Sequence, residues 1–220
     1  MNLEKNLTKQ DDKNNKILKL LSSYHKDAKC ELNHSTDFEL LVAVILSAQC
    51  TDKRVNIVTN ELFKTYNKPE DFANASSEDI EKAIYSTGFY KNKAKNIIAV
   101  SNAILNRYNG QLPTTQEELE KLPGVGRKTA NVVYSVAFGG DAIAVDTHVH
   151  RVSNRVGLVS SKNVKETEEQ LMRIIPKKDW SHFHHVLIFQ GRYVCTAQSP
   201  KCEICPIEEY CNWANENKKR

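Results

Sequence analysis

Apolar residues recur at helical spacing along most of the chain, and short polar turns separate them. The run from Leu40 to Leu46 is apolar on every side and follows Thr36 and Glu39, which have the spacing of a capping box. This run therefore predicts a buried central helix. Other stripes with helical spacing lie at 17–24, 55–63, 80–84, 97–105, 149–156, 164–175 and 183–189. We find no alternating pattern long enough to build a sheet, so the predicted fold class is all-α.

Cap and turn residues mark several helix ends. Ser76 with Asp79, and Thr115 with Glu118, have the types and spacing of N-terminal caps. A further helix is predicted to begin after Gly126 and to end before the glycine pair at 139–140, because glycine is the usual residue beyond a helix C-terminus.

The segment from Met1 to Lys16 is rich in Asn, Lys and Asp and lacks the apolar stretch of a secretory signal. We expect it to be a frayed polar lead-in. No apolar run in the chain approaches the roughly eighteen residues that a membrane span needs. We therefore expect no membrane association and a cytoplasmic location, at the nucleoid if the source is bacterial.

Length and charge narrow the possibilities only slightly. A chain of 220 residues suffices for one large domain or two small ones. The 31 basic and 27 acidic residues give a net charge of +4, which suits an anionic partner without requiring one.

The six cysteines are unevenly placed. Four of them fall near the C-terminal end with six, two and five residues between them, whereas Cys30 and Cys50 have no partner at motif spacing and are expected to be buried small residues. Thiols clustered in this way more often hold a metal than form disulfides in a reducing compartment. Spacing alone leaves zinc and an iron–sulfur cluster equally plausible. The four are Cys195, Cys202, Cys205 and Cys211.

The residues from Leu122 to Ala130 read Leu-Pro-Gly-Val-Gly-Arg-Lys-Thr-Ala. Two helices joined by such a turn form a helix-hairpin-helix, in which Gly124 and Gly126 leave backbone N–H groups at a helix N-terminus open to a phosphate. A bare Gly-x-Gly more often marks an ordinary tight turn, but the flanking residues favour DNA binding.

Three segments in order, namely this hairpin, Val145-Asp-Thr-His-Val149 and the cysteine cluster, resemble the endonuclease III family. The resemblance extends from about Leu32 to Cys211. It implies a DNA glycosylase that also cleaves at abasic sites, acts on oxidised pyrimidines in double-stranded DNA and carries a [4Fe–4S] cluster on the four clustered cysteines.

The resemblance also implies an architecture of two helical domains with the DNA groove between them. A six-helix, barrel-like domain with the hairpin would span 30–140, and residues 1–29 would join 141–220 to form the cluster domain. We expect the protein to be a monomer.

Lys128 is the expected nucleophile. It stands just inside the helix after the hairpin, where the helix dipole and Arg127 disfavour an extra positive charge and so ease deprotonation. Its attack on C1′ would expel the base and leave an imine that permits β-elimination. Asp146 is expected to cap a helix and to stabilise the developing positive charge. A nearby anion also raises a lysine pKa, and the sequence leaves that balance open.

Other residues have roles that the resemblance implies. Gln49 would fill the void left by the everted nucleotide, and Phe89, where leucine is common among relatives, would be the opposing wedge. His148 would contact substrate or phosphate, with packing as the alternative. Arg127 would contribute to DNA binding beside the hairpin glycines, and Arg192 and Lys201 would meet phosphates.

Three histidines, His182, His184 and His185, suggest a second metal site, but they point in different directions on a helix and are expected to bind none. Two alternatives to the bifunctional enzyme remain. An adenine glycosylase would have another residue at position 128 and a long C-terminal region. A non-enzymatic DNA-binding module would need neither Lys128 nor Asp146.

Overall fold

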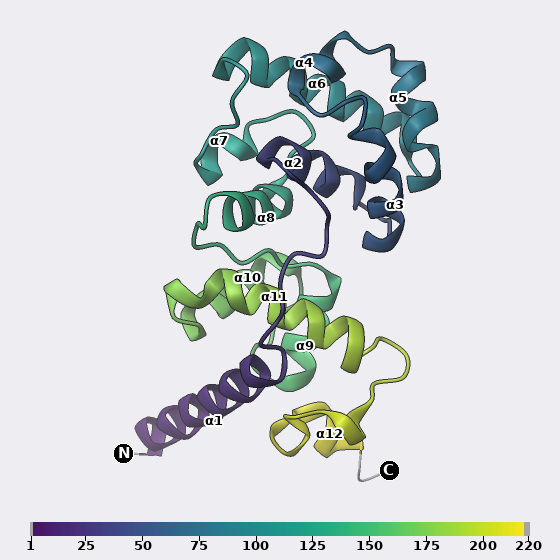
Figure 1. Cartoon of the computed structure of the whole chain (residues 1–220). Helices are drawn as coiled ribbons and strands as arrows, with labels where there is room; N and C mark the ends of the chain where they lie inside the picture. Colours follow the sequence, from purple (N-terminus) through teal and green to yellow (C-terminus); the bar gives the residue numbers. More distant parts are fainter. Residues whose placement is uncertain (1, 218–220) are drawn as a thin grey trace. The chain divides into compact units, whose positions relative to one another are not determined.

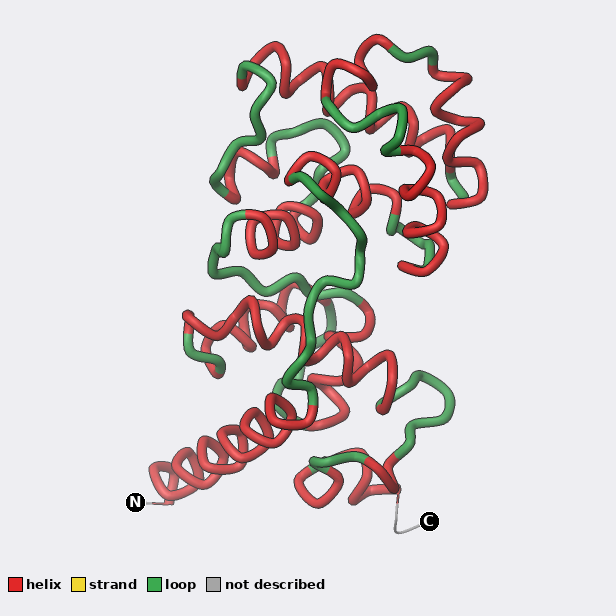
Figure 2. Tube along the Cα trace, in the orientation of Figure 1, coloured by secondary structure: helices red, strands yellow, loops and turns green. Residues whose placement is uncertain are grey.

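The computed structural model describes residues 2–217, and side chains from residue 9 onward. Within this range the chain forms only helices, turns and loops, and the prediction of an all-α fold is confirmed (Figure 2). The chain divides into two compact units, Cys30–Gly140 and the combination of Met1–Lys29 with Asp141–Arg220. Each unit is described by itself.

The unit 30–140 contains seven α-helices, one more than the six expected from the resemblance. The additional segment is short and begins at Pro69, whose fixed φ suits a first helical position. The helices are α2 (Asp37–Leu46), α3 (Asp52–Leu62), α4 (Pro69–Asn74), α5 (Ser77–Ile84), α6 (Tyr90–Tyr108), α7 (Gln116–Glu120) and α8 (Arg127–Ala137), with a 3₁₀ turn η1 (Tyr85–Thr87) between α5 and α6 (Figure 1).

Helix α2 is the centre of this unit. Every residue from Phe38 to Leu46 is buried, and the helix packs against α6 and α8. The predicted buried central helix is therefore confirmed. Its apolar surface has no solvent-facing side because neighbouring helices cover it all round.

The predicted N-terminal caps are present. The side chains of Thr36, Ser76 and Thr115 accept hydrogen bonds from the backbone N–H three residues later, at 3.1, 3.1 and 3.3 Å. The reciprocal bond of the first cap differs from the expected box, because the Glu39 carboxylate accepts from the N–H of Ser35 and not of Thr36. These caps satisfy amide groups that the helices themselves leave unpaired.

The other unit combines the first helix with the C-terminal third of the chain. Its core joins Ile17 and Leu21 of α1 to Val149 and Val152 of α9 and to Leu187 of α11. The elements are α1 (Asn2–Tyr24), α9 (Thr147–Val156), α10 (Val164–Ile174), η2 (Lys177–Asp179), α11 (Trp180–Phe189), the π-helical turn η3 (Gln190–Val194), η4 (Cys202–Ile204), η5 (Glu208–Tyr210) and α12 (Asn212–Asn217).

The expectation of a frayed N-terminal lead-in is wrong, because α1 already begins at Asn2. Contacts with the C-terminal part hold the last residues of this segment. Asn14 is buried, the Lys13 ammonium donates to the Asn212 side chain at 2.6 Å, and the Lys16 ammonium lies 5.9 Å from the centre of the Tyr210 ring. These contacts come from residues about two hundred positions away, which local sequence patterns do not register.

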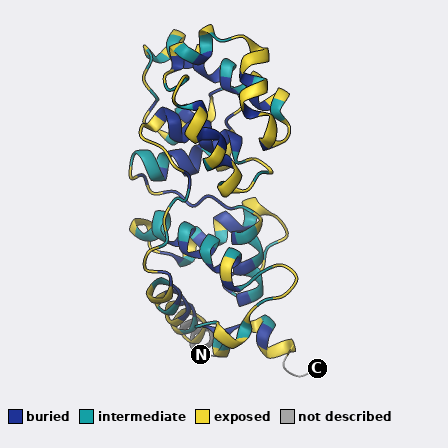
Figure 3. Cartoon of the chain, turned by 45° about the vertical axis from the view of Figure 1, so that its right-hand side comes forward, coloured by how far each residue is buried: buried dark blue, intermediate teal, exposed yellow. Residues whose placement is uncertain are grey.

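Buried residues gather on the inner faces of the helices in each unit (Figure 3). Among the described helices, none combines the length and the apolar character that crossing a membrane would require.

Candidate functional site

The hairpin between α7 and α8 is built as the sequence predicts. Leu122 and Val125 are buried and fix the turn to the core. Gly124 has φ +73°, and a Cβ at this position would lie 2.7 Å from the Asn96 side chain. A residue with a side chain would therefore suffer both backbone strain and a collision.

The N-terminus of α8 lies open beside this turn. Gly126 is the N-cap residue and supplies no side-chain cap, and a Cβ built there would meet nothing within 4 Å. Arg127 and Lys128 form the first turn, and both are exposed. The positive end of the helix dipole and two cationic side chains thus share one accessible edge, which suits an anion such as a phosphate.

A pocket in the same unit brings together three segments that are distant in sequence. It is formed by the end of α2 with the loop after it, by the start of α6, and by the hairpin. Gln49, Phe89 and Gly124, three of the predicted DNA-binding residues, all line it. The complete lining is Val44, Ile45, Ala48, Gln49, Phe89, Asn92, Lys93, Asn96, Gly124 and Thr129.

Gln49 and Phe89 share an unusual backbone conformation. Their φ values are +52° and +48°, in the left-handed region that residues other than glycine seldom adopt. Both side chains are exposed, Phe89 to 62%, although exposure of an aromatic ring to water is energetically unfavourable. Strained backbone and an exposed ring persist only where the surrounding structure holds them, and such positions are typical of binding sites.

Asp146 caps α9, as predicted. Its Oδ1 accepts hydrogen bonds from the backbone N–H groups of His148 at 2.8 Å and Val149 at 2.9 Å. The carboxylate is partly exposed, so it remains accessible while its position is fixed.

Arg151 connects His148 to the loop that carries the first clustered cysteine. Its Nη2 lies 3.2 Å from His148 Nδ1 and donates to the carbonyl oxygens of Gly191 at 2.8 Å and Cys195 at 3.0 Å. Burial lowers the pKa of Arg151, while Cys195 and Asp146 favour its charge. This role could not be predicted from sequence, because Arg151 resembles any basic residue on an amphipathic helix.

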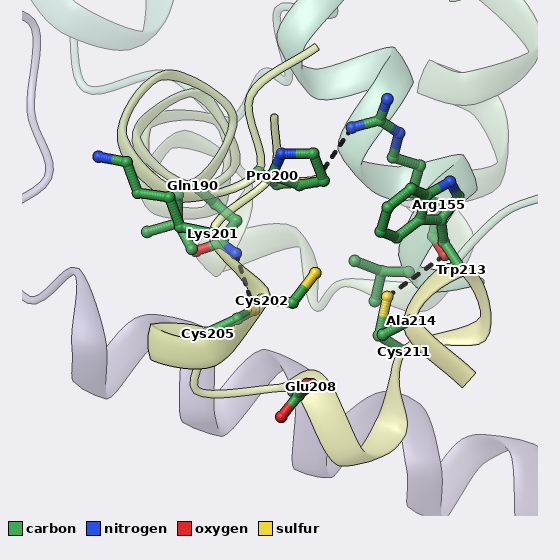
Figure 4. A pocket seen from close by; sticks show the side chains of 13 residues that line it. Arg155, Gln190, Pro200, Lys201, Cys202, Cys205, Glu208, Cys211, Trp213 and Ala214 are labelled. Carbon is green, nitrogen blue, oxygen red and sulfur yellow. Dashed lines mark hydrogen bonds between the residues drawn. The ribbon is translucent and has the colours of Figure 1, made fainter. Parts of the chain in front are cut away.

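The four clustered cysteines line one pocket in the unit formed by the two terminal segments, and Figure 4 labels Cys202, Cys205 and Cys211 among its lining side chains. Short 3₁₀ turns carry the chain between them, with Cys202 beginning η4 and Cys205 and Cys211 directly following η4 and η5. The predicted cysteines are thus brought together. Lys201 lies in the same pocket lining with an exposed side chain, and Arg192 in η3 is partly exposed.

Polar groups surround the sulfur atoms. The Gln190 amide donates to Cys205 Sγ at 3.2 Å, and an Arg155 Nη1 lies 3.7 Å from Cys195 Sγ. Burial, together with repulsion from the neighbouring thiolates, raises the pKa of the Cys202, Cys205 and Cys211 thiols. Four thiolates in one such pocket need a cationic group among them, and N–H···S bonds are usual around iron–sulfur clusters.

The remaining histidines and cysteines have other surroundings. His182 Nε2 lies 2.8 Å from Ser22 Oγ, and the rings of His184 and His185 stack with centres 4.2 Å apart. Burial lowers the pKa of His185 to about 4. The expectation that Cys30 and Cys50 are buried is wrong, because both are partly exposed. Each lies in a loop and not in a helix, which the spacing of the cysteines could not reveal.

Comparison with known proteins places these features in a family. Residues 42–177 match the model of the HhH-GPD superfamily base excision DNA repair proteins, which defines the class of the chain. Residues 195–211 match the iron–sulfur binding domain of endonuclease III. The chain belongs to the endonuclease III family, as the resemblance predicted.

The similarity covers most of the chain. Endonuclease III of Bacillus subtilis (strain 168) is 56% identical over 194 residues, which cover 88% of this chain and 89% of that protein. Endonuclease III of Escherichia coli (strain K12) is 44% identical over 197 residues, with coverage of 90% and 93%. A solved structure of a trapped endonuclease III–DNA covalent intermediate, in an estranged-adenine complex, is 51% identical with a TM-score of 0.89 and covers 92% of this chain and 95% of that one.

Membership in this family defines the class of activity. The protein is a DNA glycosylase with lyase activity at abasic sites, an enzyme of base excision repair. Its cofactor is the [4Fe–4S] cluster of the family. The four thiols that line one pocket, with N–H donors beside Cys195 and Cys205, are the donor set that such a group requires, although no three ligand side chains among the described residues are close enough to hold a metal ion as they stand.

Proposed function

We propose that the enzyme excises oxidised pyrimidines from duplex DNA through a Schiff base on Lys128 and then cleaves 3′ to the abasic site. One observation carries this proposal. Lys128 is the exposed lysine at the open N-terminus of α8, directly after the DNA-binding hairpin. A related enzyme, 51% identical, has been solved as a covalent intermediate with DNA.

The reaction needs Lys128 in its neutral form. Its Nζ lone pair attacks C1′, and the bond between C1′ and the base breaks, with the electron pair leaving on the base. The nitrogen then carries two protons, and it gives up one of them, which neutralises the departing base. Its lone pair next forms the C1′=N bond as the C1′–O4′ bond breaks, and O4′ takes a proton from solvent, which leaves a protonated imine. Loss of a C2′ proton lets the C3′–O bond break, and the 3′ phosphate leaves with that electron pair.

Asp146 stabilises the positive charge that develops at the sugar as the base departs. The two backbone N–H groups bind Oδ1, so the carboxylate is held in one orientation while Oδ2 can face the reacting nucleotide. The same carboxylate can take the proton from Lys128.

The remaining residues hold the DNA. Backbone N–H groups beside Gly124 and Gly126, with Arg127, bind the phosphates of the damaged strand. Gln49 and Phe89 enter the void that the everted nucleotide leaves and separate the orphaned base from its neighbours. In the other unit Arg192, Lys201 and His148 contact further phosphates or the substrate.

The ligands of the cluster are Cys195, Cys202, Cys205 and Cys211. Base excision transfers no electrons, so the cluster need not act in redox chemistry. When bound, it would stabilise the fold of this segment. These residues thereby fix the loop between η3 and α12, which presents Lys201 to DNA. We further propose that the protein works as a monomer in the cytoplasm, at the nucleoid if its source is bacterial, with residues 30–140 and the two terminal segments as its functional domains.

Borohydride trapping on a duplex with one abasic site tests the nucleophile. The wild-type holoenzyme should give a covalent adduct, and Lys128→Gln should give none. Lys121→Gln is a matched control, because it removes the same charge from an exposed lysine just before the hairpin. An undiminished adduct in Lys128→Gln would place the nucleophile elsewhere and disprove the proposal.

A further inference from the structure

Lys93 is a buried lysine in a place where the sequence suggests only a solvated surface. Only 4% of the residue is exposed, whereas the nearby Lys91 and Lys95 on the same helix are exposed. A buried ammonium is costly unless polar partners surround it. The burial of the Lys93 ammonium must therefore be offset by polar partners, whereas the exposed ammonium groups of Lys91 and Lys95 need none.

The partners of Lys93 are two backbone carbonyl groups at the ends of two different elements. Nζ donates to the carbonyl oxygen of Leu46, the last residue of α2, and to that of Thr87, the last residue of η1, at 2.8 Å each. Carbonyl groups at a helix C-terminus lack partners within the helix and carry the negative end of its dipole. One ammonium thus provides a hydrogen-bond donor for both carbonyl groups, and it joins the ends of two elements that are forty-one residues apart in sequence.

A residue with the left-handed backbone conformation follows shortly after each of these two anchored ends. Gln49 follows Leu46 by three residues, and Phe89 follows Thr87 by two. The backbone N–H of Lys93 also donates to the Phe89 carbonyl at 3.1 Å, so Lys93 holds that loop at two points. All three residues line the same pocket.

We propose that Lys93 is a positioning residue that fixes the spacing of Gln49 and Phe89, and so sets how well the enzyme distinguishes a duplex with a missing base from an intact one. This inference rests on the proposed void-filling roles of Gln49 and Phe89. Two loops with strained backbones would otherwise relax independently, and the gap between their tips would no longer match the gap in a base stack.

The electrostatic surroundings agree with a link of this kind. Burial lowers the pKa of Lys93, and Cys50, in the loop beside Gln49, is near enough to favour the charged form. Because burial disfavours the ammonium, its two carbonyl partners are the contacts that offset this cost.

The experiment compares the dissociation constants of the holoenzyme for two duplexes. One contains a tetrahydrofuran abasic-site analogue, and the other is the same sequence intact. The discrimination ratio is the dissociation constant for the intact duplex divided by that for the duplex with the analogue. Lys93→Met keeps the length and apolar stem of the side chain but removes every donor, and it should reduce this ratio by roughly tenfold. Lys93→Gln keeps one donor group and should give an intermediate ratio. Lys95→Met removes the same charge from an exposed site on the same helix and should leave the ratio unchanged.

A second readout separates positioning from general damage. With 2-aminopurine opposite the abasic analogue, displacement of the orphaned base raises fluorescence, and Lys93→Met should lose most of this rise. Borohydride trapping at saturating concentrations of a duplex with a natural abasic site, which unlike the analogue can form an imine, should continue, because Lys128 is untouched. A ratio within twofold of wild type in Lys93→Met would overturn the inference. If both Lys93 variants fail to fold, Lys93 is merely structural and the inference is equally wrong.

Gln49→Ala and Phe89→Ala distinguish the two levels of the proposal. If neither lowers the ratio, the void-filling role is wrong. If both lower it while Lys93→Met does not, only the role of Lys93 fails. When both are correct, the effects of Lys93→Met and Phe89→Ala should be less than additive in the double variant, because the two residues act as one unit.

Discussion

Asp146 Oδ1 accepts a hydrogen bond from the backbone N–H of Val149 at 2.9 Å, so the carboxylate that we propose to act in catalysis is also the cap of α9. The two roles can be separated because asparagine caps helices as well as aspartate does but carries no charge. Asp146→Asn should keep its melting temperature while base release slows by roughly 10²-fold or more, as when one electrostatic contact to a transition state is lost.

Asp146→Ala provides the comparison. It should lose the same activity and also about 1 kcal/mol of stability, because two amide groups at the start of α9 lose their acceptor. Thermal unfolding and single-turnover base release measure the two effects. Full activity in Asp146→Asn would show that the residue acts only as a cap.

The two hairpin glycines should respond differently to substitution. Gly124→Ala places a Cβ 2.7 Å from Asn96 at a positive φ, so it should cost at least about 1–2 kcal/mol of stability. Gly126→Ser enters open space, and its hydroxyl can cap α8, so it should raise the melting temperature slightly.

The same Gly126→Ser substitution should weaken binding to duplex DNA. The hydroxyl would occupy the amide groups that are proposed to bind a phosphate. Fluorescence anisotropy with intact duplex measures this, and tighter binding together with higher stability would argue against a phosphate at this helix end.

His185 should make stability depend on pH in a defined range. Burial first, and then the positive charges of His182 and Arg192, lower its pKa to about 4 from the ordinary 6.5. Between these values the unfolded chain binds the proton and the folded protein does not. Stability therefore falls as the pH decreases from 6.5 to about 4, by at most roughly 3 kcal/mol.

His185→Gln removes this dependence because glutamine does not titrate. Its melting temperature should change less between pH 7.5 and 5.5 than that of the wild type, measured by circular dichroism. An identical pH dependence in the two proteins would assign the effect to other groups, among which His25 also has a pKa lowered by burial.

Gln190 should matter for keeping the cluster in place. Its amide donates to Cys205 Sγ at 3.2 Å, and its oxygen accepts from His25 Nε2 at 2.8 Å, within a fully buried side chain. Gln190→Leu removes both bonds and leaves the His25 nitrogen without its partner, which costs about 1–3 kcal/mol.

The expected results for Gln190→Leu are a lower melting temperature, faster loss of iron to a chelator and a more negative reduction potential, since N–H···S bonds favour the reduced cluster. Gln198→Leu, an exposed position in the loop after Cys195, should match the wild type. Unchanged iron retention in Gln190→Leu would show that the contact with Cys205 is incidental.

Local rules predicted much of this fold. The caps at Thr36, Ser76 and Thr115 depend on residues three positions apart, and the hairpin depends on nine consecutive residues. Both features can therefore be predicted from the sequence. The cysteine spacing likewise indicated one metal-binding loop. Such features are determined by short-range geometry.

The features that sequence reasoning missed depend on contacts between distant segments. Lys93 stands among exposed lysines and differs from them only because α2 and η1 end beside it. The left-handed conformations of Gln49 and Phe89 have no compositional signal, since glycine is the usual residue for them. Arg151 and Gln190 gain their roles only when the cysteine loop folds back onto α9 and α11.

The core that joins Ile17 and Leu21 to Leu187 has a consequence for biosynthesis. A ribosome releases the first helix long before its partners, so the segment 30–140, which has its own core, can fold on the emerging chain while that helix waits. The cluster-bearing unit can close only after translation has passed the last cysteine. Iron acquisition is therefore a late event, and nascent chains that terminate early leave an apolar helix face for chaperones to cover.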